Sequence, residues 1–385
     1  MRAQHGRSKG ARSPHGGRRA APGAHPVRAL VTGANGLIGS NLVRELRQHQ
    51  WQVRAMVRAS SRLDALEGTD VKRVVGDVLQ PAESLVPLME GCDVVFHTAA
   101  HFAYAGFSPA QLEQTAVGGT RHVLEAAASA GVRRVVITSS SVVFGSSPTP
   151  FVRDETAALG HVNVDGFVEP PYVASKVKQD RLAADLGRSL GIEMVFVCPT
   201  MTMGAHATTL GPSNGLIVAY LADSLRMTYP GGCNIVSARD VAAGHRLAAL
   251  HGAAGEHYLL GGDNLTWQQV HALIAELCGV EAPRVRINHT MAYCAATLEE
   301  MRAELQRRAP LTTRDQARMV GRYYWYSHAK AAAIGFAPTP ARAALAWACA
   351  WLAASSHISR ELRTTMLLSA DVHAARAAQQ SGRTA

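Results

Sequence analysis

The chain has 385 residues, of which 47% are hydrophobic and 18% charged. That length and composition exclude a disordered protein and allow one large domain that carries a smaller one. The formal net charge is +10, but residues 1–26 hold six basic residues and no acid, which leaves +4 for residues 27–385. We therefore expect no nucleic-acid partner, and we predict that residues 1–26 form a disordered basic tail, with an organelle transit peptide as the alternative.

The cysteines and histidines give no sign of a disulfide or metal framework. The six cysteines are scattered without any CxxC pair, which suits a reducing compartment. His97 and His101 lie four residues apart but have no acidic or thiol partner nearby in the sequence. The longest apolar run, residues 343–354, is too short for a membrane span of roughly 20 residues. We expect a cytoplasmic protein with no metal and no transmembrane segment.

Apolar runs and helical periodicity alternate along the first half of the chain. The predicted strands cover residues 28–32, 52–57, 71–75, 94–97, 134–138 and 193–198. The predicted helices cover residues 37–49, 112–130 and 172–190. Strands that are apolar throughout and separated by helices are typical of a parallel sheet covered on both faces. The predicted fold class is therefore α/β, a doubly wound parallel sheet of the Rossmann type.

After residue 199 the pattern is less regular. Expected elements are strands at 235–236 and 256–260 and helices at 240–251 and 266–278, the last with Thr266 or Asn264 as its N-cap. The predicted organisation is a nucleotide-binding domain at 27–199 that is rejoined by about 234–262, a smaller substrate lobe at 200–233 and 263–354, and a C-terminal extension at 355–385. For the extension, a terminal helix packed on the body is favoured over a partner-binding or membrane-surface helix.

Residues 32–39 read Thr-Gly-Ala-Asn-Gly-Leu-Ile-Gly and lie between the first predicted strand and the first predicted helix. Glycine is required where this turn is tight, where the backbone approaches a diphosphate and where the helix packs on the strand. The helix N-terminus adds unpaired N–H groups and a positive dipole end. The loop therefore predicts a dinucleotide site, with a purely structural turn as the alternative. The expected contact residues are Gly33, Asn35, Gly36, Leu37, Ile38 and Gly39.

The residues after the second predicted strand indicate which dinucleotide binds. Arg58 stands directly after that strand and Arg62 four residues further on, where an acid would bind the ribose hydroxyls of NAD. A guanidinium group pairs instead with a 2′-phosphate, so NADP(H) is preferred and NAD(H) is the alternative. A solvated loop charge is the alternative for Arg62. Asp77 and Val78, after the third strand, are expected near the adenine, although Asp77 also suits a turn.

Tyr172 and Lys176 stand four residues apart and therefore share one face of a predicted helix. The pKa of a free tyrosine is about 10, and a nearby lysine together with the positive charge of a nicotinamide would lower it. Ser140, at the end of the fifth predicted strand, is placed to hydrogen-bond a substrate oxygen as charge develops on it. These three residues are the predicted catalytic set.

The glycine loop, the Thr-Ser-Ser-Ser strand end at 138–141 and the Tyr-x-x-x-Lys helix resemble the extended short-chain dehydrogenase/reductase family. Within this NAD-dependent epimerase/dehydratase superfamily, the chain is most similar to the branch that holds dihydroflavonol 4-reductases, 3β-hydroxysteroid dehydrogenases and hopanoid-associated sugar epimerase homologues. The segments that carry this likeness include residues 53–58, 95–100, 198–200 and 258–266. The resemblance covers about residues 28–355.

The resemblance implies that Ser140 polarises the carbonyl, that Tyr172 transfers the proton and that Lys176 also holds the nicotinamide ribose. In this family the helix around the catalytic tyrosine often contributes to two-fold dimers, so a homodimer is expected. Further cofactor contacts are implied for Thr98, Ala99, Ala100, Pro199 and Thr200.

Two positions depart from the family pattern. Ala116 replaces an asparagine that often opens the helix before the fifth strand. Gly145 replaces an asparagine that contacts the flavonoid in plant reductases, which speaks against a flavonoid substrate. An epimerase would need a diphosphate clamp, yet residues 201–235 offer Arg226 as their only cation and otherwise indicate an apolar pocket or core.

The sequence therefore predicts an NADP(H)-dependent oxidoreductase that acts on a small to medium, largely apolar substrate. It would reduce a ketone or aldehyde, or oxidise a secondary alcohol, with Tyr172 as the acid and base. A sugar or nucleotide-sugar epimerase and a non-catalytic NADP-binding regulator are the alternatives.

Overall fold

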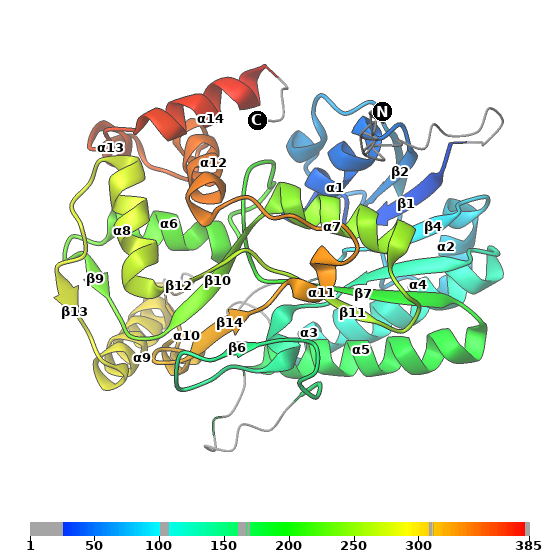
Figure 1. Cartoon of the computed structure of the whole chain (residues 1–385), viewed down its shortest axis with the longest axis horizontal. Helices are drawn as coiled ribbons and strands as arrows, with labels where there is room; N and C mark the ends of the chain where they lie inside the picture. Colours follow the sequence, from blue (N-terminus) through cyan, green and yellow to red (C-terminus); the bar gives the residue numbers. More distant parts are fainter. Residues whose placement is uncertain are drawn as a thin grey trace, which may run out of the picture.

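A computed structural model describes residues 26–100, 108–160, 167, 170–307, 310 and 312–381. The predicted tail at 1–26 lies outside the described residues, apart from Pro26. In the described part, the chain forms an α/β half built on a large sheet, and a smaller half with its own sheet packs against one end of it (Figure 1).

The larger half is built on seven parallel strands in the order β11-β7-β5-β4-β1-β2-β3. Their bounds are β1 Arg28–Thr32, β2 Gln52–Val57, β3 Lys72–Val75, β4 Val94–His97, β5 Arg134–Thr138, β7 Glu193–Pro199 and β11 His257–Leu260. The order reverses at β1, because β2 pairs with one side of it and β4 with the other. At such a reversal the loops after the two strands diverge, and they leave a crevice at the carboxyl edge of the sheet where ligands bind.

Helices cover both faces of this sheet (Figure 1). One face carries α1 Leu37–Gln48 and α7 Ala238–His251, and the other carries α2 Ala82–Met89, α4 Gly119–Ser129 and α5 Pro171–Leu190. Neighbouring residues of one strand enter different cores: Phe96 packs with α1 and α7, whereas Val95 packs with α2 and α4. Because both faces are buried, the strands are apolar at successive positions, and the predicted doubly wound parallel sheet is confirmed.

The smaller half has a five-stranded sheet in the order β12-β10-β14-β6, with β8 paired to β10. Its strands are β6 Val152–Arg153, β8 Met201–Met203, β10 Gly232–Ser237, β12 Asp263–Thr266 and β14 Tyr323–Tyr326. β6 follows β5 in the chain and β8 follows β7, so the loops that leave the large sheet supply strands to the small one. The sequence predicted an irregular lobe here, and the second sheet is a finding of the structure.

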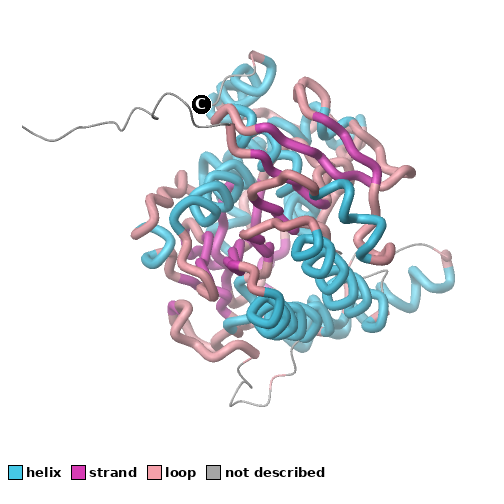
Figure 2. The backbone as a smooth tube through the Cα atoms, turned by 90° about the vertical axis from the view of Figure 1, so that its right-hand side faces the viewer, coloured by secondary structure: helices cyan, strands magenta, loops and turns pink. Residues whose placement is uncertain are grey.

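The tube view shows helices around the strands of the molecule (Figure 2), and helices also pack into the core of the small sheet. The helices that share its core are α6 Pro212–Ala222, α8 Trp267–Cys278, α12 Ala341–Ala354 and α14 Ala370–Gln380. Met203, Ile217 and Leu221 are buried in that core, so the apolar stretch at 201–235 supplies packing residues. The apolar run at 343–354 is α12 and is buried in the same core.

The remaining elements are short or peripheral. They are α3 Pro109–Glu113, α9 His289–Leu305, α10 Arg314–Arg318, α11 Ala329–Ala332, α13 Arg360–Thr364, β9 Met227–Thr228, β13 Val285–Arg286, η1 Asp64–Leu66, η2 Gln114–Gly118 and η3 Ser141–Phe144. α14 packs on α12, so the described C-terminal segment ends in a helix that lies on the body. Across the described ranges, no helix has both the length and the apolar character that a membrane crossing requires.

Most predicted elements of the larger half agree with the structure to within one residue at each end. The helix predicted at 112–130 is instead three segments, α3, η2 and α4, because η2 is one turn of π-helix that interrupts it. α2 was not predicted at all. Thr266 is the N-cap of α8, since its side chain accepts a hydrogen bond from the N–H of Gln269, whereas Asn264 lies within β12.

Candidate active site

The turn after β1 has a shape that only glycine permits. Gly33 has a φ of +62°, and a Cβ there would lie 2.8 Å from the Cα of Ala99. A Cβ at Gly39 would lie 2.2 Å from the carbonyl oxygen of Gly33, because α1 starts directly against the turn. Gly36 is the N-cap of α1 and has no side chain, so the first N–H groups of the helix, at Leu37 and Ile38, remain uncovered by a cap. This cradle fits the diphosphate of a dinucleotide.

The residues after β4 lie beside this turn, as the sequence predicted. Thr98 Oγ1 donates to the carbonyl oxygen of Thr32 at 2.6 Å, and the N–H of Ala99 donates to Thr32 Oγ1 at 3.2 Å. These bonds join the carboxyl ends of β1 and β4 at the point where the strand order reverses. Ala100 follows as an exposed residue.

The carboxyl end of β7 lies on the same edge of the sheet, two strands beyond β4. Pro199 is the last residue of β7 and is buried. The hydroxyl of Thr200 donates to Asn234 Oδ1 at 2.7 Å, so this residue ties the large sheet to β10 of the small one. Pro199 and Thr200 therefore border the junction of the two halves.

The two arginines after β2 differ in their surroundings. Arg58 is exposed, and no carboxylate of the described residues forms an ion pair with it. Arg62 forms an ion pair with Asp64, and its carbonyl oxygen accepts a hydrogen bond from Asn35 Nδ2 at 3.3 Å. The loop that carries both arginines is thus attached to the glycine turn. Arg58 is the guanidinium group that remains available to a ligand.

Asp77 and Val78 follow β3 in a turn. Asp77 Oδ1 accepts a hydrogen bond from the N–H of Leu79 at 3.0 Å, which is the turn role that the sequence left open for this residue. Val78 is buried against α4, where a Cβ at Gly119 would lie 2.9 Å from Val78 Cγ2. Both residues also lie at the carboxyl edge of the sheet, since they come directly after β3.

The three predicted catalytic residues converge at the carboxyl end of β5. Ser140 follows that strand as the N-cap of η3. Tyr172 and Lys176 lie one turn apart at the start of α5, which begins with Pro171. A side-chain hydrogen bond joins Ser140 to Tyr172, and Lys176 Nζ donates to the carbonyl oxygen of Thr138 at 3.0 Å. The structure thus brings together a hydroxyl, a phenol and an ammonium group from two elements.

Burial dominates the electrostatics of this trio. It raises the pKa of Tyr172 well above its ordinary value, although the hydrogen bond from Ser140 acts in the opposite direction. Burial lowers the pKa of Lys176 to about 8, although the charge of Asp180 acts to raise it. Near neutral pH the phenol therefore carries its proton and the ammonium group is charged. The expected lowering of the tyrosine pKa involves the positive charge of a bound nicotinamide and stays a prediction. In the protein by itself, desolvation outweighs the opposing hydrogen bond from Ser140.

Asp180 is a buried acid next to Ser140, Tyr172 and Lys176 that was not predicted from the sequence. Asp180 Oδ2 accepts a hydrogen bond from Ser139 Oγ at 2.5 Å and pairs with His257 Nε2 at 3.2 Å. Its Oδ1 has no hydrogen-bond partner among the described residues. The available signal was an acid four residues after Lys176 on the same helix face. Its histidine partner could not be found that way, because it lies 77 residues further along the chain.

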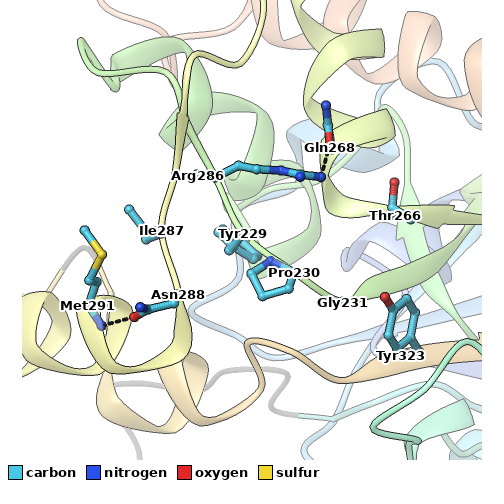
Figure 3. A pocket seen from close by; sticks show the side chains of 10 residues that line it. All are labelled: Tyr229, Pro230, Gly231, Thr266, Gln268, Arg286, Ile287, Asn288, Met291 and Tyr323. Atoms are coloured by element: carbon cyan, nitrogen blue, oxygen red, sulfur yellow. Dashed lines mark hydrogen bonds between the residues drawn. The ribbon is translucent and has the colours of Figure 1, made fainter.

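A cavity lies elsewhere, on the smaller half. It measures about 480 Å³ and is bordered by β9, β13 and the start of α9. In Figure 3 the side chain of Arg286 extends along the wall to Gln268, with Tyr229, Asn288 and Tyr323 around the same hollow. None of its lining residues belongs to the predicted catalytic or cofactor set. The predicted catalytic and cofactor residues lie instead at the carboxyl edge of the large sheet.

A parallel sheet of this order, with a glycine turn after β1 and a serine, a tyrosine and a lysine at its carboxyl edge, defines a dinucleotide-dependent enzyme of the extended short-chain class. Residues 29–261 match the NAD dependent epimerase/dehydratase family, and the chain belongs to that family. This confirms the resemblance on which the sequence analysis relied.

Two relatives and one solved structure illustrate the likeness. The chain is 32% identical over 84% of its length to a Synechocystis protein that carries the name dihydroflavonol 4-reductase, of which 93% is covered. It is 33% identical, also over 84% of its length, to sterol demethylase protein B of Methylococcus capsulatus, of which 97% is covered. The crystal structure of gox2253 superposes with a TM-score of 0.74 at 28% identity, covering 87% of this chain and 100% of that one. The chain is an NAD(P)-dependent dehydrogenase/reductase of the extended short-chain family.

Proposed function

We propose that the protein is an NADP(H)-dependent oxidoreductase that reduces a ketone or aldehyde of a largely apolar substrate, or oxidises the corresponding secondary alcohol. The observation that carries this proposal is the hydrogen bond between Ser140 and Tyr172, with the Lys176 ammonium group one helical turn away. The predicted division into domains, the homodimer and the cytoplasmic location remain predictions.

The residues divide the reaction between them. Bound NADPH supplies a hydride to the carbonyl carbon. Tyr172 transfers its hydroxyl proton to the carbonyl oxygen, which becomes the alcohol, and the phenolate that remains is stabilised by the Lys176 charge. The hydroxyl of Ser140 donates a hydrogen bond to the same oxygen while negative charge builds up on it. The phenol of Tyr172 carries its proton when the substrate binds, because burial raises its pKa above the ordinary value.

The cofactor would lie along the carboxyl edge of the large sheet. The N–H groups at the start of α1, at Leu37 and Ile38, would hold the diphosphate, and Lys176 would hold the nicotinamide ribose. At the other end, Arg58 would pair with a 2′-phosphate, since its guanidinium group is exposed at the end of β2. This last contact supports NADP(H) over NAD(H).

An apolar substrate is supported by the lack of free cationic side chains in residues 201–235 of the smaller half. Arg226, the sole cation of residues 201–235, donates to the carbonyl oxygens of Tyr220 at 2.6 Å and Leu221 at 3.1 Å. Its guanidinium group therefore ties α6 to β9 and is already engaged, so it is a poor candidate for a diphosphate clamp. The names of the two relatives, which refer to a dihydroflavonol and a sterol, also point to apolar ring systems.

Turnover of NADPH with a panel of ketones and aldehydes tests the proposal. We expect Tyr172→Phe to lower kcat by about 10²- to 10⁴-fold while NADPH still binds, because the variant loses the proton that the oxygen needs. Tyr258→Phe is the matched control, since the hydroxyl of Tyr258 accepts a hydrogen bond from the N–H of Ala253 within the large half and is no part of the site.

Three outcomes would contradict the proposal. Full turnover by Tyr172→Phe would remove the phenol from the reaction. NADPH binding without turnover on any carbonyl compound would favour a regulator. Tightly held NAD, released only when the purified protein is denatured, would favour an epimerase that oxidises and reduces one carbon with the same cofactor molecule.

A further inference from the structure

A line of buried polar side chains runs from Lys176 to the carboxyl end of β1. Lys176 Nζ donates to Gln179 Oε1 at 2.8 Å, and Gln179 Nε2 donates to Thr120 Oγ1 at 2.9 Å. Thr120 Oγ1 is 3.1 Å from His97 Nε2, and His97 Nδ1 is 2.9 Å from Thr32 Oγ1. All five side chains are buried, so water does not compete for these bonds. The line crosses from α5 through α4 and β4 to β1, where it ends one residue before the glycine turn.

The ammonium group at one end of this line has few acceptors. It has three N–H donors, and burying one without an acceptor is costly. The carbonyl oxygen of Thr138 accepts one of them, and Gln179 is the only side chain of the described residues that accepts another. Ala116 lies buried in η2, which packs against α5, and its methyl group offers no acceptor. The third donor is left for a ligand.

The amide of Gln179 is fixed in its orientation. Its oxygen faces the ammonium group, and its nitrogen faces the hydroxyl of Thr120. A flipped amide would bring N–H donors against the Lys176 charge, so the line of hydrogen bonds allows one arrangement. Gln179 is 1% exposed, which leaves its side chain no room to turn toward solvent.

We propose that Gln179 is a positioning residue for Lys176: its amide, locked by Thr120, holds the ammonium group where the nicotinamide ribose binds. Gln179 acts through Lys176 and is not itself a catalytic residue. The inference rests on the proposed function, because it presupposes that Lys176 contacts that ribose.

Four ionisable groups near Lys176 are expected to keep the same charge while Lys176 is titrated. Asp180, on the next turn of α5, is a nearby negative charge. His97 on β4 is neutral, because burial and the Lys176 charge lower its pKa to about 3. The thiol of Cys198 on β7 and the phenol of Tyr172 keep their protons, because burial raises the pKa of each. Among these groups, Lys176 is the one whose charge changes on moderate alkalinisation.

The test is the dissociation constant of NADPH, measured by fluorescence on the full chain between about pH 6 and pH 10. We expect the affinity of the unmodified protein to fall as pH rises through the pKa of Lys176. Gln179→Leu removes a neutral acceptor, which disfavours the charged lysine and moves this transition about one pH unit lower. Gln179→Glu supplies a negative acceptor and moves the transition about one pH unit higher. A merely structural role would give no such opposite displacements.

Two further variants distinguish a failure of the proposed role of Lys176 from a failure of the inference about Gln179. Lys176→Met abolishes the transition if Lys176 contacts the cofactor. Lys178→Met, on the same helix, removes an exposed ion pair with Glu113 of α3 and leaves the transition in place. If Lys176→Met keeps the transition, the proposed role of Lys176 fails. If Lys176→Met abolishes it but both Gln179 variants follow the unmodified protein, the inference about Gln179 alone is overturned. Should Gln179→Leu not fold, the direction given by Gln179→Glu decides.

Discussion

The proposed preference for NADP(H) over NAD(H) rests on a single guanidinium group at the end of β2. Arg58 is exposed, and its charge is not neutralised by a described carboxylate, whereas Arg62 already pairs with Asp64. An exposed ion pair of this kind contributes little to stability, but it lowers the charge that Arg62 can offer to a phosphate. The sequence placed both arginines correctly after β2, but it could not assign the Arg62 side chain to its neighbour two residues on.

We therefore expect Arg58→Asp to weaken NADPH binding about 10- to 100-fold and to leave NADH binding equal or tighter, since a charge-assisted hydrogen bond to the 2′-phosphate is lost. Arg62→Ala should have the smaller effect. Fluorescence titration with both dinucleotides measures these affinities. Arg188→Asp, an exposed substitution near the C-terminal end of α5, is the control. An unmodified protein that binds NADH as tightly as NADPH would refute the preference.

At the scale of elements, the close approach of α1 to the turn after β1 limits which residues can replace the glycines of that turn. Gly39 lies in the first turn of α1, where an added Cβ would lie 2.2 Å from the carbonyl oxygen of Gly33. The helix would have to move away from β1, and its N–H groups would leave the position that the diphosphate needs.

Gly39→Ala is thus expected to weaken NADPH binding at least about tenfold and to lower the unfolding free energy by about 1–3 kcal/mol. Gly118→Ala is the matched control, because a Cβ there meets no atom within 4 Å and the residue has a helical φ of −62°. In that control, stability should stay the same or rise slightly. Fluorescence titration and urea unfolding measure both effects, and unchanged NADPH affinity in Gly39→Ala would contradict this account.

Some of these elements could be predicted from the sequence, and others could not. The strands of the large sheet could be predicted because both of their faces are buried, which makes them apolar without interruption. α2 escaped prediction, since Pro87 lies inside a helix of eight residues. The small sheet escaped because several of its strands are two to four residues long and come from distant parts of the chain. The positions of Ser140, Tyr172 and Lys176 followed from the fold, whereas the hydrogen-bond partners of Asp180 and Gln179, which are His257 and Thr120, lie far along the chain and are encoded by no local pattern.

At the scale of the whole molecule, several histidines are buried without charge. Burial lowers the pKa of His97 to about 3 and that of His245 and His271 to about 4. His245 Nδ1 bonds to the carbonyl oxygen of Val241 at 2.8 Å, so this nitrogen carries the proton and Nε2 accepts from the hydroxyl of Thr138. A second proton on this ring would force the hydroxyl of Thr138 to accept a hydrogen bond instead of donating one, and it would place a charge in a buried site.

The protein should consequently lose stability in mild acid. Between the ordinary histidine pKa of about 6.5 and the lowered values, the unfolded chain binds more protons than the folded one, so the unfolding free energy falls as pH falls. Each buried histidine should contribute on the order of 1–2 kcal/mol to this loss by about pH 5. Urea unfolding at about pH 6.5 and at about pH 5 measures this loss of unfolding free energy. His245→Gln should flatten the dependence, and the exposed His251→Gln on the same helix should not; equal stability at both pH values would contradict the assignment.

The small sheet takes β6 and β8 from the loops that follow β5 and β7 of the large one, so the polypeptide passes between the two halves several times. No single division of the sequence would separate all strands of the large sheet from all strands of the small one. A lineage with this architecture cannot acquire a new specificity by grafting a ready-made module, as proteins with serial domains can. Its diversification has to proceed by point substitution and by insertion in the crossing loops, which leaves the glycine turn and the catalytic helix in place.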